Sequence, residues 1–145
     1  MRVVRVGAAG TAAELAGLFR GVPMVLSSKA QGLVRDVPCK PMIVIATPGF
    51  EPRVRPVSNE RGAAGHEYRA VAILDAWTSL YALGVDARLD TLTAWMRAVS
   101  LCAPRSRGGQ TLILGETDPA IAQSLMMWDS RILASKDLDE RMETG

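Results

Sequence analysis

The sequence predicts an α/β domain in which a mostly parallel sheet carries helices on its faces. Two segments, 42–46 and 71–74, are unbroken apolar runs without the alternation that a half-exposed strand would show. We therefore expect both to be central strands buried on both faces and neighbours in one sheet. Strand-like and helix-like segments also alternate along the chain, in the order β-α-β-β-α-α-β-α-α. A chain of 145 residues is long enough for one such domain with a substantial core.

The N-terminal part predicts a strand, a helix and a second strand. Residues 3–7 are expected to form the first strand, and 11–14 have the Thr-x-x-Glu spacing of a capping box at a helix start. Gly21 is expected to end the helix, and residues 24–26 to form the next strand. The inward face of the helix is predicted at Leu15, Leu18 and Phe19. The small residues of 7–10 could form a phosphate-binding turn, but they lack the known phosphate-loop patterns, and a simple tight turn is the alternative.

The middle of the chain predicts two irregular segments on either side of the strand at 42–46. Residues 27–40 are polar and mixed, which indicates a loop. Residues 48–65 are rich in proline and glycine and carry several arginines, so we expect a flexible loop.

The C-terminal half predicts four helices and one further buried strand. Helices are expected at 76–83 and 88–101, a buried strand at 111–114 and a final amphipathic helix at 132–142. Asp118 followed by proline predicts the start of the remaining helix. The inward faces of the helices at 88–101 and after Asp118 are predicted at Leu89, Leu92, Trp95, Met96, Val99, Ile121, Leu125 and Trp128.

Composition excludes several classes of protein. A net charge of +2, from 17 basic and 15 acidic residues, is too balanced to imply nucleic acid or membrane by charge alone. No apolar stretch reaches a membrane span, and the apolar N-terminus is too short for a signal peptide, so we expect a cytoplasmic protein. Cys39 and Cys102 stand alone, which indicates buried thiols, and His66 is the only histidine. A histidine-based metal cluster or a free choice of catalytic base is therefore not expected.

Few residues combine into a recognisable catalytic pattern. Asp75 directly follows the run at 71–74, where open α/β sheets place ligands, but capping of the next helix explains its position better. Asp86, Asp90 and Glu116 could pair for acid–base work, although helix caps and exposed acids are the more ordinary explanation. Arg105 and Arg107, among small residues, could hold a phosphate or form a solvated turn. No convergent nucleophile, base and oxyanion donors are found.

Several blocks of sequence occur in the same order as in a known family. They are 10–15 (G-T-A-A-E-L), 19–23 (F-R-G-V-P), 43–52 (I-V-I-A-T-P-G-F-E-P), 68–77 (Y-R-A-V-A-I-L-D-A-W), 97–114, 128–129 and 138–141. In these blocks the chain resembles the second helicase lobe of the primosomal replication-restart protein N′ family (PriA), especially its actinobacterial form. The resemblance covers nearly the whole chain. It implies one RecA-like three-layer lobe over residues 1–145, as a fragment of a longer protein.

The resemblance also implies what has been lost. Active members of the family use ATP through a Walker loop and bind zinc through cysteine clusters, and this sequence has neither pattern. Their arginine motif Q-x-x-G-R-x-G-R falls on residues 97–104, where its two arginines are replaced by Leu101 and Pro104. An arginine at the transferring phosphate is worth about 10³ to 10⁵ in rate. We therefore expect neither ATPase nor helicase activity and no cofactor, with Thr47 and Asp75 as remnants of a nucleotide site.

The predicted function is a non-catalytic, PriA-like role in replication restart at the nucleoid. By resemblance, its partners are forked or single-stranded DNA and primosome proteins, and a missing lobe would leave an apolar face open for self-association. Phosphate contacts are expected from arginines in loops, namely Arg53, Arg55, Arg105 and Arg107. Two alternatives remain: a small nucleotide-binding enzyme that uses Gly7–Gly10 and Asp75, and a scaffold that only presents a protein-interaction surface.

Overall fold

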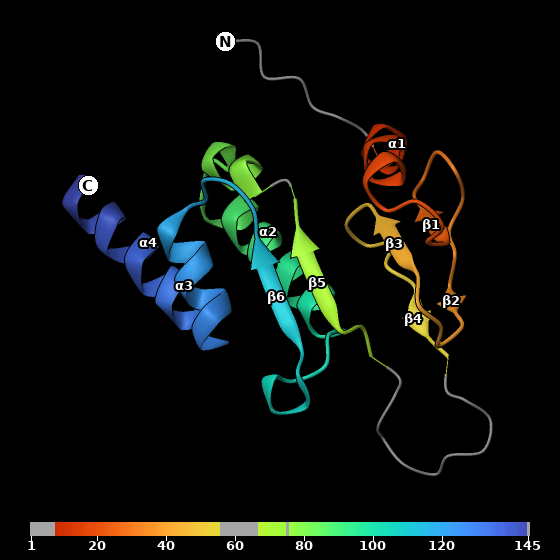
Figure 1. The fold of residues 1–145 in the computed structure, drawn as a ribbon. Coiled ribbons are helices and arrows are strands. Elements are labelled where there is room, and N and C mark those ends of the chain that lie inside the picture. Colours follow the sequence, from red (N-terminus) through yellow and green to blue (C-terminus); the bar gives the residue numbers. More distant parts are fainter. Residues whose placement is uncertain (1–7, 56–66, 75, 145) are drawn as a thin grey trace. The chain divides into compact units, whose positions relative to one another are not determined.

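The computed structural model describes residues 8–55, 67–74 and 76–144, and it divides the chain into two compact units. The first unit comprises Met1–Glu67 and the second Tyr68–Gly145. Each unit combines helix with short parallel strands, which agrees with the predicted α/β class (Figure 1). The single RecA-like lobe and the placement of the runs 42–46 and 71–74 in one sheet stay predictions.

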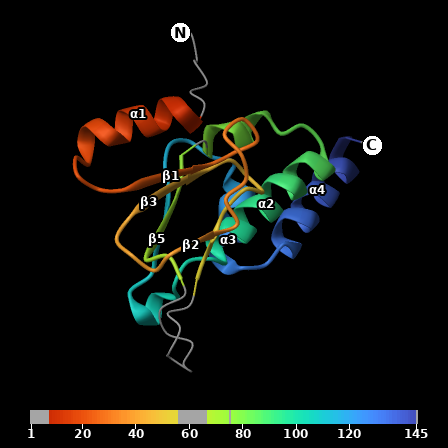
Figure 2. The same cartoon turned by 90° about the vertical axis from the view of Figure 1, so that its right-hand side faces the viewer.

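The first unit is built from one helix and two parallel strand pairs. Its elements are α1 (Ala8–Leu18), β1 (Met24–Ser27), β2 (Asp36–Val37), β3 (Ile43–Ala46) and β4 (Arg53–Val54). β1 pairs with β3 from Met24 opposite Ile43 to Ser27 opposite Ala46, and β2 pairs with β4. α1 packs against β1 and β3 and lies along that strand pair in Figure 2. The strands predicted at 24–26 and 42–46 are thus confirmed within one residue.

Several expectations for the first unit need correction. α1 already includes Ala8–Gly10, so Thr11 lies inside the helix and does not cap it. The reason is that alanine is the strongest helix former, and it extends the helix beyond the Thr-x-x-Glu signal. Leu18 and Phe19 of the predicted inward face are 76% and 49% exposed. The strand predicted at 3–7 lies outside the described residues.

The two predicted loops of the first unit contain strand pairing. β2 lies in the segment 27–40 and β4 in the segment 48–65. Arg53 N donates to Arg35 O at 2.9 Å, and Arg55 N donates to Val37 O at 2.8 Å, which ties the two segments together. Two-residue strands are too short to show the alternation on which strand prediction depends. The flexibility expected for 48–65 stays a prediction.

The second unit packs its helices on one face of a strand pair. Its elements are β5 (Ala70–Ile73), the 3₁₀-helix η1 (Ala76–Tyr81), α2 (Val85–Val99), the 3₁₀-helix η2 (Arg105–Arg107), β6 (Gln110–Ile113), α3 (Pro119–Met127) and α4 (Arg131–Thr144). β5 and β6 are parallel, in register from Ala70 opposite Gln110 to Ile73 opposite Ile113. α2 packs against β5 and α3, and α4 packs against α2 and α3 (Figure 1).

The core of the second unit confirms most of the predicted helix faces. Its buried residues are Ala76, Leu92, Trp95, Ala120, Ile121, Leu125 and Leu133, with Ile73, Leu89, Met96, Val99 and Ile113 packed against them. Trp128 is the exception: it is 54% exposed and lies outside this core. The final helix is confirmed, but Leu138 and Met142, at 58% and 73% exposed, do not contribute a buried face.

The strands of the second unit are less buried than predicted. Along β5, exposed Ala70 and Ala72 alternate with half-buried Val71 and Ile73. In and after β6, Leu112 and Leu114 are 50% and 46% exposed. The expectation of burial on both faces is therefore wrong for these strands as the structure describes them, because the helices cover only one face of the pair. In the described part of the chain, no helix is long and apolar enough to cross a membrane.

Candidate functional site

The turn that carries Arg105 and Arg107 is held by its own backbone. It forms the 3₁₀-helix η2, in which Gly108 N donates to Arg105 O at 3.0 Å and Gly109 N donates to Pro104 O at 3.1 Å. Pro104 enters the turn in an extended conformation with φ −65°, and Gly108 leaves it at φ 82°, where glycine carries no steric cost. The sequence Pro-Arg-Ser-Arg-Gly-Gly thus specifies a short, defined turn with its arginines outward.

The segment before the turn is fixed against the start of β5. Ala103 N donates to Tyr68 O at 2.8 Å, and Tyr68 N donates to Leu101 O at 2.9 Å. The Cys102 thiol donates to Gln110 O at 3.4 Å, which links this segment to β6. Leu101 and Pro104 stand where the family motif has its two arginines. In this chain their backbone carbonyls help to hold the turn.

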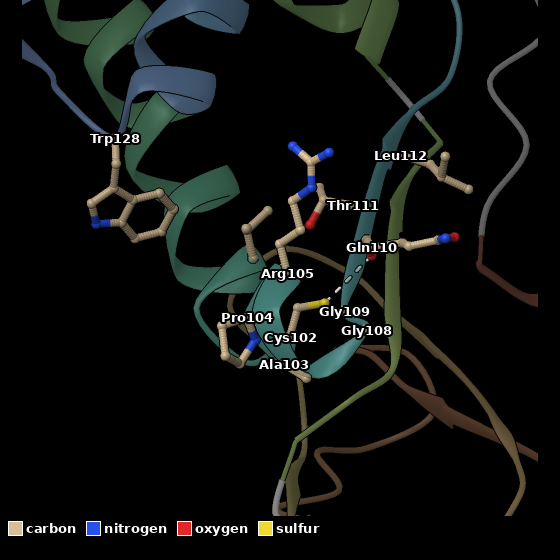
Figure 3. A pocket seen from close by; sticks show the side chains of 11 residues that line it. Cys102, Ala103, Pro104, Arg105, Gly108, Gly109, Gln110, Thr111, Leu112 and Trp128 are labelled. Carbon is tan, nitrogen blue, oxygen red and sulfur yellow. Dashed lines mark hydrogen bonds between the residues drawn. The ribbon is translucent and has the colours of Figure 1, made fainter.

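A pocket of about 870 Å³ lies in the second unit between η2, β6 and the end of α3. Figure 3 shows the Arg105 side chain rising into the space between Trp128 and β6, with Thr111 pointing toward Arg105 and Leu112 pointing away. Its lining residues are Val99, Cys102, Ala103, Pro104, Arg105, Gly108, Gly109, Gln110, Thr111, Leu112 and Trp128. Arg105 is the one charged residue among them, so the lining is positive and contains no carboxylate.

Arg105 and Arg107 share this turn, whereas Arg53 and Arg55 belong to the first unit. Arg53 lies in β4 rather than in a loop, and Arg55 directly follows it. All four side chains are exposed. The four predicted phosphate contacts thus form two separate pairs, and only Arg105 lines a described pocket.

The predicted nucleotide-site remnants do not form a described site. Thr47 follows β3, with its N–H donating to Ser27 O at 3.2 Å and its carbonyl accepting from Phe50 N at 2.9 Å. Asp75 and Gly7 lie outside the described residues. Ala8–Gly10 are helical rather than a glycine turn, which removes the described part of the predicted phosphate-binding turn.

A second polar cluster, which sequence analysis missed, links α2 to the start of α3. Asp118 caps α3 by accepting from Ala120 N at 2.9 Å and Ile121 N at 3.1 Å, as its Asp-Pro signal predicted. The same carboxylate also accepts two hydrogen bonds from Arg88 Nη2, at 3.0 and 3.1 Å. Arg88 Nη1 lies 3.8 Å from Glu140 Oε2. The two partners are 30 residues apart, so no local pattern could have joined them. This cluster ties three helices together, and its residues do not line the described pocket, so we interpret it as structural.

The predicted acid–base candidates do not line the described pocket. Asp86 and Asp90 both lie in α2, as their spacing predicted, and both are exposed, as is Glu116. Asp86 stands in the first turn of α2, where the helix dipole favours a negative charge. The ordinary explanation for these residues therefore suffices.

Asp129, next to Trp128, has its charge offset by a neighbour. Arg131 donates to its carboxylate from Nη2 at 2.7 Å, from Nε at 3.0 and 3.1 Å and from the backbone N–H at 2.9 Å. These hydrogen bonds, the side-chain ones first, lower the pKa of Asp129 from 3.8 to about 2. This carboxylate, next in sequence to the pocket residue Trp128, is thus ionised at neutral pH and already paired with a cation.

The side chains that could bind a metal ion are scattered in the described part of the chain. Within the described ranges, no three His, Cys, Asp or Glu side chains lie close enough to share a metal ion. Cys39 is exposed in the first unit, so the expectation of a buried thiol is wrong there, and Cys102 is half-buried in the second unit, where it lines the pocket. Neither thiol has a described set of further ligands around it.

The chain is similar in sequence to a group of known proteins that share one name. It is 37% identical over all 145 of its residues to the probable replication restart protein PriA of Mycobacterium leprae (strain TN). The identity is also 37% to the protein of the same name from Mycobacterium tuberculosis (strain ATCC 25618 / H37Rv). The chain spans about a fifth of the length of these relatives, 21% and 20%. No protein-family model matches the chain, and no solved structure matches it. The resemblance to actinobacterial PriA that the sequence indicated is thereby confirmed.

Proposed function

We propose that this chain acts in replication restart as a non-catalytic, PriA-like domain that contacts DNA phosphates through Arg105 and Arg107. The observation that carries the proposal is the η2 turn: its backbone hydrogen bonds fix both arginines outward, and Arg105 lines a pocket without a carboxylate. Similarity over all of this chain, to about a fifth of the length of proteins named for replication restart, supports the biological setting. Arg53 and Arg55 are proposed as a second phosphate contact, in the first unit. Such a protein would work in the cytoplasm, at the nucleoid.

Contacts of this kind are electrostatic, and the test uses that property. Each phosphate that a cation neutralises releases counterions, so log affinity falls linearly with log salt concentration. We expect binding to forked DNA to weaken steeply between about 50 and 200 mM salt. Replacing Arg105 and Arg107 together by alanine should reduce the salt slope by up to about 2, near one unit for each contact. Affinity that does not depend on salt would contradict the proposal.

A matched control separates a specific contact from a change of net charge. Arg20 is exposed in the first unit, just after α1. Arg20→Ala removes one positive charge far in sequence from both arginine pairs, and it should leave the slope nearly unchanged. If Arg20→Ala and Arg105→Ala lower the slope equally, then binding is diffuse and the η2 turn has no special role.

The absence of ATP turnover is part of the same proposal. Leu101 and Pro104 cannot supply the positive charge that an arginine brings to a transferring phosphate. We expect phosphate release from ATP to stay at the background rate when forked DNA is added to the purified chain. Stimulation of release by DNA would overturn the non-catalytic assignment while leaving DNA binding intact.

One observation favours a protein-interaction role as a second candidate. Leu74, Leu112 and Leu114 are 42%, 50% and 46% exposed at or next to the strand pair β5–β6. Exposed apolar side chains of this kind support self-association or the docking of a primosome protein. Light scattering at increasing concentration tests this role: Leu112→Glu should lower the average mass if the wild-type chain associates. A monodisperse monomer at every concentration would argue against self-association.

A further inference from the structure

Trp128 adopts a backbone conformation that bulky residues rarely take. It ends α3 with φ 55° and ψ 39°, and it is the one non-glycine residue with positive φ in the described part of the chain. A left-handed tryptophan is strained, and strain of this kind gathers at functional sites. The conformation carries the indole out of the helical stripe that Ile121 and Leu125 bury. The ring is therefore 54% exposed, despite belonging to the most hydrophobic class of side chains.

The exposed ring shares its pocket with a positive charge. Trp128 and Arg105 line the same hollow from opposite elements, the end of α3 and the η2 turn (Figure 3). The Arg105 side chain is exposed, and Thr111 adds a hydroxyl on the β6 side. The nearest carboxylate in sequence, that of Asp129, is held by Arg131. The pocket thus combines an aromatic face, a guanidinium and no uncompensated negative charge.

We propose that Trp128 is a stacking platform for an unpaired base of single-stranded DNA, with the adjoining phosphate at Arg105. The inference deepens the proposed function and rests on it. In a duplex, bases are covered by their neighbours above and below, so only a splayed, single-stranded base can offer its face to an indole ring. An aromatic platform beside a cation is the usual construction of single-strand sites. A pocket of about 870 Å³ has room for one nucleotide, and binding pockets typically span about 300 to 1,000 Å³.

The experiment compares two substitutions of Trp128 on single-stranded and duplex DNA. Trp128→Phe keeps an aromatic face, whereas Trp128→Leu keeps apolar bulk without one. We expect Trp128→Leu to weaken binding of a labelled oligothymidylate by roughly 5- to 150-fold, the range for one lost base stack. Trp128→Phe should retain most of the affinity, and duplex binding should change little with either variant.

Salt dependence distinguishes the two contacts. Stacking releases no counterions, so Trp128→Leu should lower affinity at every salt concentration without changing the slope, whereas Arg105→Ala should reduce the slope. Binding of the oligonucleotide should also quench indole fluorescence in the wild-type chain, and the part of the quenching that comes from Trp128 should be lost in Trp128→Leu. Trp95 is only 7% exposed and cannot stack on a base. Met127→Ala, at the neighbouring exposed residue, is the matched control and should bind like the wild type.

The binding data distinguish failure of the stacking platform from failure of the proposed function. If Trp128→Leu binds single strands as well as the wild type does, while Arg105→Ala binds them less well, the platform is refuted and the phosphate contacts stand. If Trp128→Leu loses single-strand and duplex affinity equally, the ring has no role specific to unpaired bases and the platform is again refuted. If neither Trp128→Leu nor Arg105→Ala affects binding, both the proposed function and the platform are wrong. Circular dichroism of each variant verifies that the fold is retained.

Discussion

Asp118 is the residue of the second unit at which one substitution should reveal most about stability. Its carboxylate accepts two backbone N–H bonds at the start of α3 and two bonds from Arg88. The side chains of Arg88 and Asp118 are only 12% and 20% exposed. The backbone N–H of Asp118 is held as well, since it donates to the buried Ser79 Oγ at 2.9 Å. Asp118→Ala therefore removes a helix cap and one partner of a largely buried ion pair at the same time.

The two losses can be estimated separately. An aspartate cap replaced by alanine costs about 1 kcal/mol. Breaking a fully buried ion pair costs about 3 to 5 kcal/mol and an exposed pair about 0 to 1 kcal/mol, so this partly exposed pair should cost about 2 kcal/mol. The free energy of unfolding should fall by about 3 kcal/mol in Asp118→Ala. Asp118→Asn keeps a good cap and loses the charge, so it should cost about 2 kcal/mol.

Urea unfolding followed by circular dichroism measures these differences. A double-mutant cycle with Arg88→Met isolates the pair, because the further substitution Asp118→Asn should cost much less once Arg88 is gone. We expect a coupling energy of at least about 1 kcal/mol, within the range for contacting residues. A cost near zero for Asp118→Asn, together with a coupling below about 0.3 kcal/mol, would refute the ion pair as a stabilising contact.

Three further predictions concern single positions of the second unit. Trp128→Gly should be more stable than Trp128→Ala by about 1 kcal/mol in urea unfolding, because only glycine relieves the strain of the left-handed backbone. A more stable alanine variant, the usual order within a helix, would contradict that conformation. Gly109→Ala should lower the free energy of unfolding by about 3 kcal/mol or more, because an added Cβ would overlap the backbone of Ala103. Gly108→Ala should lower it by only about 1 kcal/mol, and similar costs for both would refute the close approach. NMR titration should give Asp129 a pKa of about 2, and Arg131→Gln should return it toward 3.8. Because this folded-state pKa is depressed, the pair stabilises the chain fully above about pH 4, and that contribution is lost as the pH falls through 2.

Sequence patterns predicted those strands and helices that are marked by residues close together in the sequence. The strands β3, β5 and β6 were predicted within one residue of their observed bounds, since a short apolar run marks a strand directly. Asp118 followed by proline fixed the start of α3. The stripe on α2 identified core residues such as Leu92, because helical periodicity reports which face is buried.

What the sequence did not predict depends on contacts between distant segments. An apolar run cannot tell whether one or both faces of a strand are covered, which is why β5 and β6 were expected to be more buried. The pairing of β2 with β4 lacks any periodic signal, and Arg88 gives no local sign of its partner Asp118.

The candidate site was predicted in part. The arginines at 105 and 107 were identified from their loop composition, and the structure places them on one fixed turn. Periodicity predicts Trp128 in the core because it continues the inward stripe of α3, but the helix ends at Met127 and Trp128 takes a left-handed backbone with an exposed side chain. The left-handed conformation of one residue at a helix end thus accompanies the change from an expected core residue to a pocket residue, and periodicity contains no information on that conformation.

The two ends of α3 explain why stability and binding should separate under mutation. At its N-terminus, Asp118 satisfies the free N–H groups and pairs with Arg88, so substitutions there act on the free energy of unfolding and leave the pocket intact. At its C-terminus, Trp128 is strained and half exposed, so its replacement removes an unfavourable conformation along with the contact surface. A residue selected only for stability would not be a left-handed tryptophan, since glycine or asparagine serves a helix end better. Loss of single-strand affinity in a Trp128→Gly variant, together with little loss of stability, would therefore identify the ring as a functional group.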